Sequence, residues 1–219
     1  GDFLAVAEEN GSIEQIDWQM FDLTCREIPR LCANGAYVCI NVSARHFRSP
    51  DLDEAVLALL RVRGIEPTLL RLEVTEGALL DNPDQIRRVL QRLRDAGVLS
   101  QLDDFGTGYS SLSYLHRFPI HTIKIDQSFV KEIHDEHGHY PVILAIISIA
   151  RGLGLHLIAE GVETEGQARY LQDKGCTTMQ GYLYHRPISL GSFIGVLQEQ
   201  NRLIADAAPA PSRTLTIEA

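Results

Sequence analysis

The 219-residue sequence has few of the features that mark secreted, membrane or nucleic-acid-binding proteins. Its four cysteines form no C-x-x-C pair and show no metal-ligand spacing, so we interpret them as buried thiols of a reducing compartment. No apolar run approaches the roughly 18 residues of a membrane helix, and we see no signal peptide. Acidic residues outnumber basic ones, and the formal charge of −9 argues against binding to duplex nucleic acid.

What is present is an ordinary globular composition, with 45% hydrophobic and 22% charged residues. This length and composition suit one α/β domain, which we expect over residues 1–204. The Ala- and Pro-rich residues 205–219 are expected to be a disordered tail. A phosphate-bearing substrate is compatible with the acidic charge if a divalent cation lies between the acids and the phosphate.

Strand-like and helix-like patterns alternate along the chain. Nearly continuous apolar runs predict six parallel strands with helices on their faces, at 36–41, 69–76, 98–104, 121–126, 155–160 and 176–182. Helix signals separate them, including a short helix near 111–117 and a last helix over 189–201. Ser12 with Gln15, and Thr164 with Gln167, have the spacing of capping boxes.

Polar residues end all six predicted strands: Asn41, Glu73, Asp103 with Asp104, Lys124, Glu160 and Gln180. An open doubly wound sheet would use chiefly the strands at its switch point, whereas an α/β barrel carries its active site on the whole ring of strand ends. Six polar ends therefore favour a TIM-like (β/α)8 barrel. Since a barrel of this type has about eight strands, we expect its first strands to lie before Gly1.

These residue types suit metal-assisted hydrolysis of a phosphodiester. Carboxylates and an amide oxygen are hard ligands that suit Mg²⁺ or Mn²⁺ better than zinc. Adjacent Asp103 and Asp104 are able to serve two ions, one carboxylate bridging them. Lys124, among these acids, would keep its charge and orient a water or steady a phosphoryl oxygen.

The sequence resembles the EAL domain family of bacterial cyclic di-GMP phosphodiesterases. The resemblance covers nearly all of residues 3–188, through the strings FLAVAEENGSI, INVSARHF, LEVTE, LDDFGTGYSSLSYL, KIDQSFV, IAEGVET and QGYLYHRP. It implies hydrolysis of cyclic di-GMP to linear pGpG in the bacterial cytoplasm. It also implies a homodimer, and sensor or cyclase-like domains in the same polypeptide.

The resemblance also implies residue roles. The implied metal ligands are Asn41, Glu73, Asp103, Asp104 and Glu160. Lys124 would orient the attacking water, with Asp104, Glu163 and Gln180 also counted as catalytic, while Glu76 would anchor the loop after Asp104 and Arg45 would contact the substrate.

One departure keeps a second function open. The family's Glu-Ala-Leu motif, whose glutamate is a metal ligand, is not in this sequence, and the family order would place it upstream of Gly1. The alternative to an enzyme is therefore a non-catalytic receptor or regulatory module that binds cyclic di-GMP.

Overall fold

The computed structural model describes residues 2–32, 36–107 and 115–207, in two units that comprise residues 1–186 and 187–219. The first unit holds a six-stranded parallel sheet formed by β1 (Val38–Asn41), β2 (Leu70–Thr75), β3 (Leu99–Phe105), β4 (Thr122–Ile125), β5 (His156–Ala159) and β6 (Thr178–Met179). The strands follow one another in the sheet in chain order. That sequential order is typical of an α/β barrel, whereas a doubly wound sheet reverses its order at a switch point.

All six predicted strands are present, and each lies inside its predicted range or within one residue of it. Within the described residues, β1 pairs only with β2 and β6 only with β5, so these two strands are the edges of the sheet. The further strands expected before Gly1 stay a prediction.

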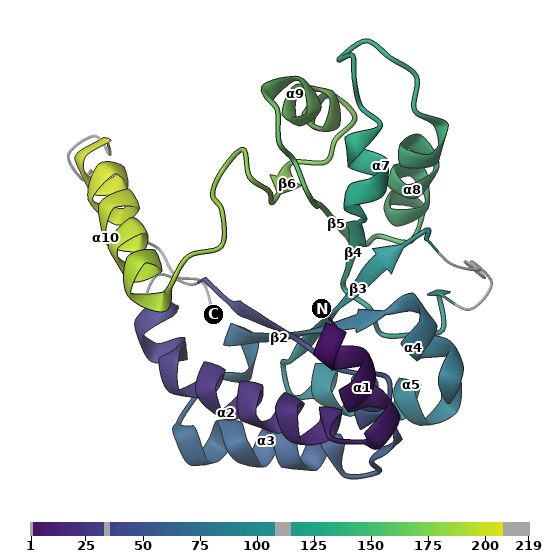
Figure 1. Ribbon diagram of the computed structural model, residues 1–219, viewed down its shortest axis with the longest axis vertical. Coiled ribbons are helices and arrows are strands. Elements are labelled where there is room, and N and C mark those ends of the chain that lie inside the picture. The colour runs from purple at the N-terminus through teal and green to yellow at the C-terminus, as the bar shows by residue number, and fades with distance from the viewer. Residues whose placement is uncertain (1, 33–35, 108–114, 208–219) are drawn as a thin grey trace, which may run out of the picture. The chain divides into compact units, whose positions relative to one another are not determined.

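Helices connect the strands and cover the sheet (Figure 1). In chain order they are α1 (Asp2–Asn10), α2 (Ile13–Leu31), α3 (Leu52–Arg63), α4 (Glu76–Asp81), α5 (Pro83–Asp95), α7 (Gln127–Lys131), α8 (Pro141–Gly152) and α9 (Glu165–Asp173), with short 3₁₀ turns at His46–Arg48 and Pro67–Leu69. Helix α2 packs on β1, α5 on β3, and α8 on β4 and β5. The predicted helix near 111–117 falls largely on residues outside the described ranges.

The apolar patterns explain why these elements form. All four residues of β4 are buried, as expected for a strand covered on both faces. In α5 the buried side chains are Ile86, Val89, Leu90 and Leu93, which recur with the helical period. Gly97, just after α5, has a φ of +101°, a conformation that glycine adopts without a steric cost. The helix therefore ends there and the chain turns into β3.

The two predicted capping boxes have different outcomes. At α9, Thr164 Oγ1 accepts a hydrogen bond from the Gln167 backbone N–H at 3.2 Å, and Gln167 Oε1 accepts one from the Thr164 N–H at 3.1 Å, so this box is confirmed. The Ser12 box is wrong, because the Ser12 side chain makes no capping bond. Ser12 has helical backbone angles, with φ −72° and ψ −10°, instead of the extended conformation typical of a cap.

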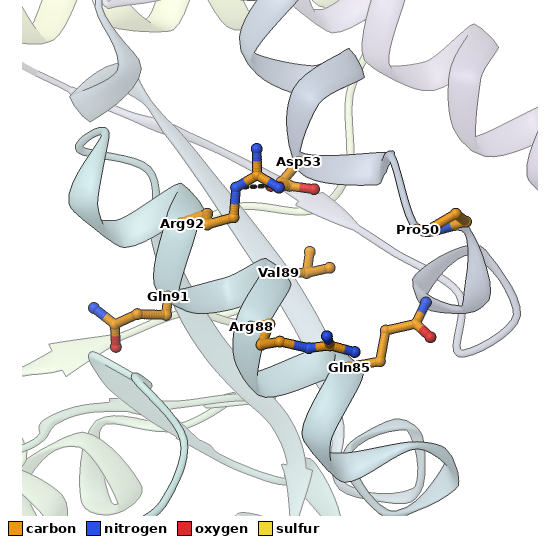
Figure 2. Close-up of a pocket in the computed structure, with 7 residues that line it drawn as sticks. All are labelled: Pro50, Asp53, Gln85, Arg88, Val89, Gln91 and Arg92. Carbon is orange, nitrogen blue, oxygen red and sulfur yellow. Dashed lines mark ion pairs between the residues drawn. The ribbon is translucent and has the colours of Figure 1, made fainter.

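An ion pair joins α3 to α5 (Figure 2). Arg92 Nε lies 2.7 Å from Asp53 Oδ2, and the Asp53 residue is 1% exposed. The contact is electrostatic, because neither Asp53 oxygen has a protein hydrogen-bond partner of good geometry among the described residues. Arg88, Gln85 and Asp53 line a cavity of about 340 Å³ beside this pair.

The second unit contains α10 (Leu190–Ala207). This helix is longer than the predicted 189–201, and it includes the first residues of the segment expected to be a tail. Residues 208–219 lie outside the described residues, so a disordered tail stays a prediction. Among the described residues, no helix has both the length and the apolar character needed to cross a membrane.

Candidate metal centre

The parallel register brings the carboxyl ends of the strands together at one end of the sheet. Asn41, the last residue of β1, pairs with Glu73 of β2, and Thr75 of β2 pairs with Asp103 of β3. Glu160 directly follows β5, and its backbone N–H donates to the carbonyl of Ile125 at the end of β4. The sheet thus positions the polar strand ends at the same end of the sheet.

Lys124 of β4 contacts carboxylates from β2, from β3 and from the residue that follows β5. Its Nζ lies 3.0 Å from Glu73 Oε2, 3.1 Å from Asp103 Oδ1 and 2.7 Å from Glu160 Oε1. The Lys124 side chain is 4% exposed, and those of the three acids are 11–15% exposed. The predicted contact between Lys124 and these acids is therefore present in the structure.

The acids keep Lys124 protonated. Burial is the largest influence on its pKa and acts to lower it, but the hydrogen bond to Glu160 and the charges of Glu73, Glu160 and Asp103 together raise the pKa above its ordinary value. Burial also raises the pKa of Glu160, against the opposing effect of Lys124. One ammonium group faces three carboxyl groups, so the ionised cluster has an excess of negative charge.

A β-bulge explains how two consecutive aspartates serve one site. The register between β3 and β4 shifts between Leu102 and Phe105. Within the bulge, Asp104 has a φ of +54°, a left-handed conformation that costs a non-glycine residue free energy. In a regular strand consecutive side chains point to opposite faces. The bulge allows Asp103 and Asp104 to contribute to the same cluster.

Asp103, Asp104 and Glu160 are close enough to share a cation. One carboxylate oxygen from each lies within 4.8 Å of the other two. Burial raises the pKa of Asp104, and the charges of Asp103 and Asp126 raise it further, as expected where acids crowd together. An all-carboxylate donor set fits Mg²⁺, Mn²⁺ or Ca²⁺ better than a soft metal.

The remaining predicted site residues lie around this cluster. Gln180, just after β6, donates from Nε2 to Glu160 Oε1 at 2.5 Å. Asn41 is beside Glu73 in the register. Glu163 lies three residues beyond Glu160, and its backbone N–H donates to Gln167 Oε1 at 2.8 Å. Among the described residues, no side-chain hydrogen bond joins Asn41 or Glu163 to the cluster.

Glu76 begins α4 and contacts the loop that follows the two aspartates. Its Oε2 accepts a hydrogen bond from the Gly106 backbone N–H at 3.4 Å. Gly106 has a φ of +95°, and a Cβ there would lie 3.1 Å from the ring of Phe129. Glu76 thus contacts the start of the loop, whose residues from 108 to 114 lie outside the described part, and its role as an anchor stays a prediction.

Arg45 lies in a different environment from the one expected of a substrate contact. Its Nε donates to Glu14 Oε1 of α2 at 3.2 Å, and its guanidinium packs on Gly11. Among the described residues it has no contact with the strand-end acids. In this conformation Arg45 joins the loop after β1 to the Glu8 carbonyl of α1 and to Glu14 of α2.

The sequence analysis missed two acids. Asp126 is 9% exposed, caps α7 through Oδ1 and contributes to the raised pKa of Asp104. Its position two residues after Lys124, at the end of the predicted strand 121–126, was a usable signal. Asp17 accepts hydrogen bonds from the Ser43 N–H at 3.2 Å and Oγ at 2.7 Å, and lies 3.1 Å from Nδ1 of buried His46. No sequence signal indicated this long-range contact.

Curated proteins and solved structures include relatives of this chain that are named phosphodiesterases. The chain is 39% identical over 216 residues to the cyclic di-GMP phosphodiesterase NbdA of Pseudomonas aeruginosa, and this match covers 97% of the chain and 27% of NbdA. The solved complex of the PaMucR phosphodiesterase with c-di-GMP is 38% identical, with a TM-score of 0.82, over 88% of this chain and 85% of that one.

A complex of Klebsiella pneumoniae BlrP1 with manganese and cyclic di-GMP is 31% identical, with a TM-score of 0.71, over 80% of this chain and 45% of that one. The chain spans about a quarter of the length of the curated relatives that it matches first. Residues 1–187 match the profile of the EAL domain. The chain therefore belongs to the EAL domain family.

Proposed function

We propose that this chain hydrolyses cyclic di-GMP to linear pGpG with the help of divalent metal ions. The observation that carries the proposal is the cluster of Asp103, Asp104 and Glu160, whose carboxylate oxygens lie within 4.8 Å of one another. The likeness to NbdA, named a cyclic di-GMP phosphodiesterase, and to the c-di-GMP complex of PaMucR supports the choice of substrate.

The proposed metal ligands are Asn41, Glu73, Asp103, Asp104 and Glu160, with Mg²⁺ or Mn²⁺ as the metal and two ions in the site. Bound divalent ions would supply a nucleophilic water at neutral pH and neutralise charge on the phosphate. The manganese complex of BlrP1 supports a divalent metal. In this proposal the bulge at Asp103 and Asp104 provides adjacent carboxylates for the two ions.

The chain's other residues hold and orient the reactants. Protonated Lys124 would orient the attacking water and stabilise negative charge on the phosphoryl oxygens through its ammonium group. Gln180 would keep Glu160 in position through its 2.5 Å hydrogen bond. Glu163 would support the same water network, and Glu76 would hold the loop after Asp104.

The proposal extends to partners and place of action. We expect a homodimer, which sedimentation would show as twice the chain mass of 24.4 kDa. We also expect the chain to act in the bacterial cytoplasm as one domain of a larger signalling protein. The chain spans only about a quarter of the length of its curated relatives, which supports its being one domain of a larger protein. MucR, which is named a bifunctional diguanylate cyclase and cyclic di-GMP phosphodiesterase, supports it too.

The test is release of pGpG from cyclic di-GMP with Mn²⁺ or Mg²⁺, followed by chromatography. It should use both the chain as printed and the protein in its full natural length. Asp103→Asn should lower the rate at least about 100-fold, because it removes a ligand and a charge from the cluster. Asp173→Asn, at the exposed end of α9, is the matched control and should keep the wild-type rate.

Metal-dependent turnover that disappears in Asp103→Asn would support the enzyme. Saturable binding of cyclic di-GMP with no turnover in the full natural length would overturn hydrolysis and favour a receptor.

A further inference from the structure

A basic groove lies at the amino ends of β4 and β5, at the opposite ends of these strands from Lys124 and Glu160. His121 directly precedes β4 and His156 begins β5. The backbone N–H of His156 donates to the His121 carbonyl at 3.0 Å, which fixes the two residues side by side. Their imidazole rings are stacked, with centroids 4.4 Å apart and planes inclined by 18°.

Two adjoining cavities form this groove. The larger, of about 380 Å³, is lined by Arg94, His116, His121 and His156, with apolar side chains such as Phe118 and Leu155. The smaller, of about 220 Å³, shares Leu155 and His156 and adds Arg151. Neither lining contains a carboxylate, although acidic residues outnumber basic ones, 29 to 20, in the whole chain.

The basic side chains of the groove have no acidic partner within the described residues. No ion pair with Arg94, His121 or His156 is present there. The pKa of His121 is lowered, first by burial and then by the positive charges of His156, Arg71 and Arg94. Protonation of His121 is therefore opposed by its surroundings, and a bound anion would offset that effect.

A purely structural role explains only part of the groove. Arg94 and Arg151 lie in the last turns of α5 and α8, where positive side chains favourably face the helix dipole. His116, His121 and His156 belong to a loop and to strand starts, so the dipole does not account for them. From this convergence we propose that the groove is a binding site for a small phosphate-bearing anion, separate from the metal centre.

Pyrophosphate is a suitable probe, titrated into the full chain by calorimetry in EDTA so that no divalent metal links it to the acidic cluster. Wild-type protein should bind about one pyrophosphate, more weakly as salt is added. In NMR spectra the ring signals of His121 and His156 should shift along the same binding curve.

Substitutions locate the site. Arg94→Gln and His121→Gln should each weaken binding about tenfold, because the first removes a guanidinium group and the second an imidazole donor to the anion. Arg87→Gln is the matched control, since Arg87 is also exposed on α5 and lies two turns, or about 10.5 Å, from Arg94 along the helix. It should bind as wild type does.

Absence of saturable binding would overturn the proposal. So would equal loss in Arg94→Gln and Arg87→Gln, which would indicate general attraction to surface charge. Circular dichroism of each variant distinguishes a lost site from a lost fold. If His121→Gln does not fold, the histidine ring shifts of the wild-type protein and the Arg94→Gln affinity still decide the question.

Discussion

At the scale of single residues, Lys124 and its acids are mutually dependent. The ammonium group has three carboxylate neighbours within 3.1 Å, and its side chain is almost fully buried. Removing one partner from such a group leaves uncompensated charge in a poorly solvated place, and this costs more than losing a surface ion pair. The metal-free stability of the protein therefore depends on Lys124.

We predict that Lys124→Met lowers the free energy of unfolding by about 3 kcal/mol in EDTA at pH 7. Urea denaturation measures this. Lys131→Met is the control, since Lys131 Nζ makes one surface hydrogen bond to Gln127 Oε1 at 3.1 Å and its loss should cost less than about 0.5 kcal/mol. Equal stability of Lys124→Met and wild type would contradict the burial of this charge network.

The buried thiols predict a loss of stability at alkaline pH. Burial raises the pKa of Cys176 from 9.0 to about 11. The unfolded chain therefore loses this proton first, so the contribution of Cys176 is fully present below pH 9 and declines as the pH rises to 11. Two pKa units correspond to about 3 kcal/mol at most.

Cys176→Ala should flatten this decline, whatever its stability at neutral pH. Urea midpoints measured at several pH values between 8 and 11 give the slopes to compare. Parallel slopes for wild type and Cys176→Ala would show that the thiol titrates alike in both states.

The residue scale also shows the limits of sequence reasoning. Lys124 was predictable because it lies near the carboxyl end of an apolar strand, and the carboxyl ends of parallel strands lie together. The partner of Arg45 was not, because the contact with Glu14 depends on how α2 packs beside β1, across 31 residues of sequence. The same holds for Asp17 and His46, which are separated by 29 residues.

At the scale of elements, the strands and long helices were predictable, because apolar runs and helical periodicity report burial directly. The short helices α4 and α7 were not predicted, since five or six residues give too little periodicity. The bulge at Asp103 and Asp104 was also missed, because the alternation of a strand in the sequence carries no mark of an extra residue. Yet the bulge is what places both aspartates in the site.

The two capping boxes provide a matched pair of substitutions. Thr164→Ala should destabilise the protein by about 1 kcal/mol, because it removes a cap that α9 uses. Ser12→Ala should change stability by less than about 0.5 kcal/mol, because Ser12 makes no side-chain capping bond. Urea denaturation of both variants tests this, and a larger loss in Ser12→Ala would contradict the conformation of the α1–α2 junction.

At the scale of the whole molecule, all strands are parallel, so their carboxyl ends lie together and their amino ends lie together. The carboxyl ends are acidic, and the amino ends of β4 and β5 are basic. The carboxyl ends hold the proposed metal centre, and the amino ends hold the groove around His121 and His156. The polar residues at the carboxyl ends predicted the metal centre from the sequence. The groove was not predicted, because its residues come from separate connections whose meeting depends on the fold.

The most direct test of the account is calorimetric titration of Mn²⁺ into the chain and into Asp103→Asn and Asp173→Asn. It requires metal binding alone, so it is decisive whether or not the chain as printed turns over substrate. We predict saturable binding to wild type and Asp173→Asn, and affinity at least about tenfold weaker in Asp103→Asn, because a carboxylate ligand is lost. Equal affinity in all three proteins, or no binding to any, would contradict a metal centre at the strand ends.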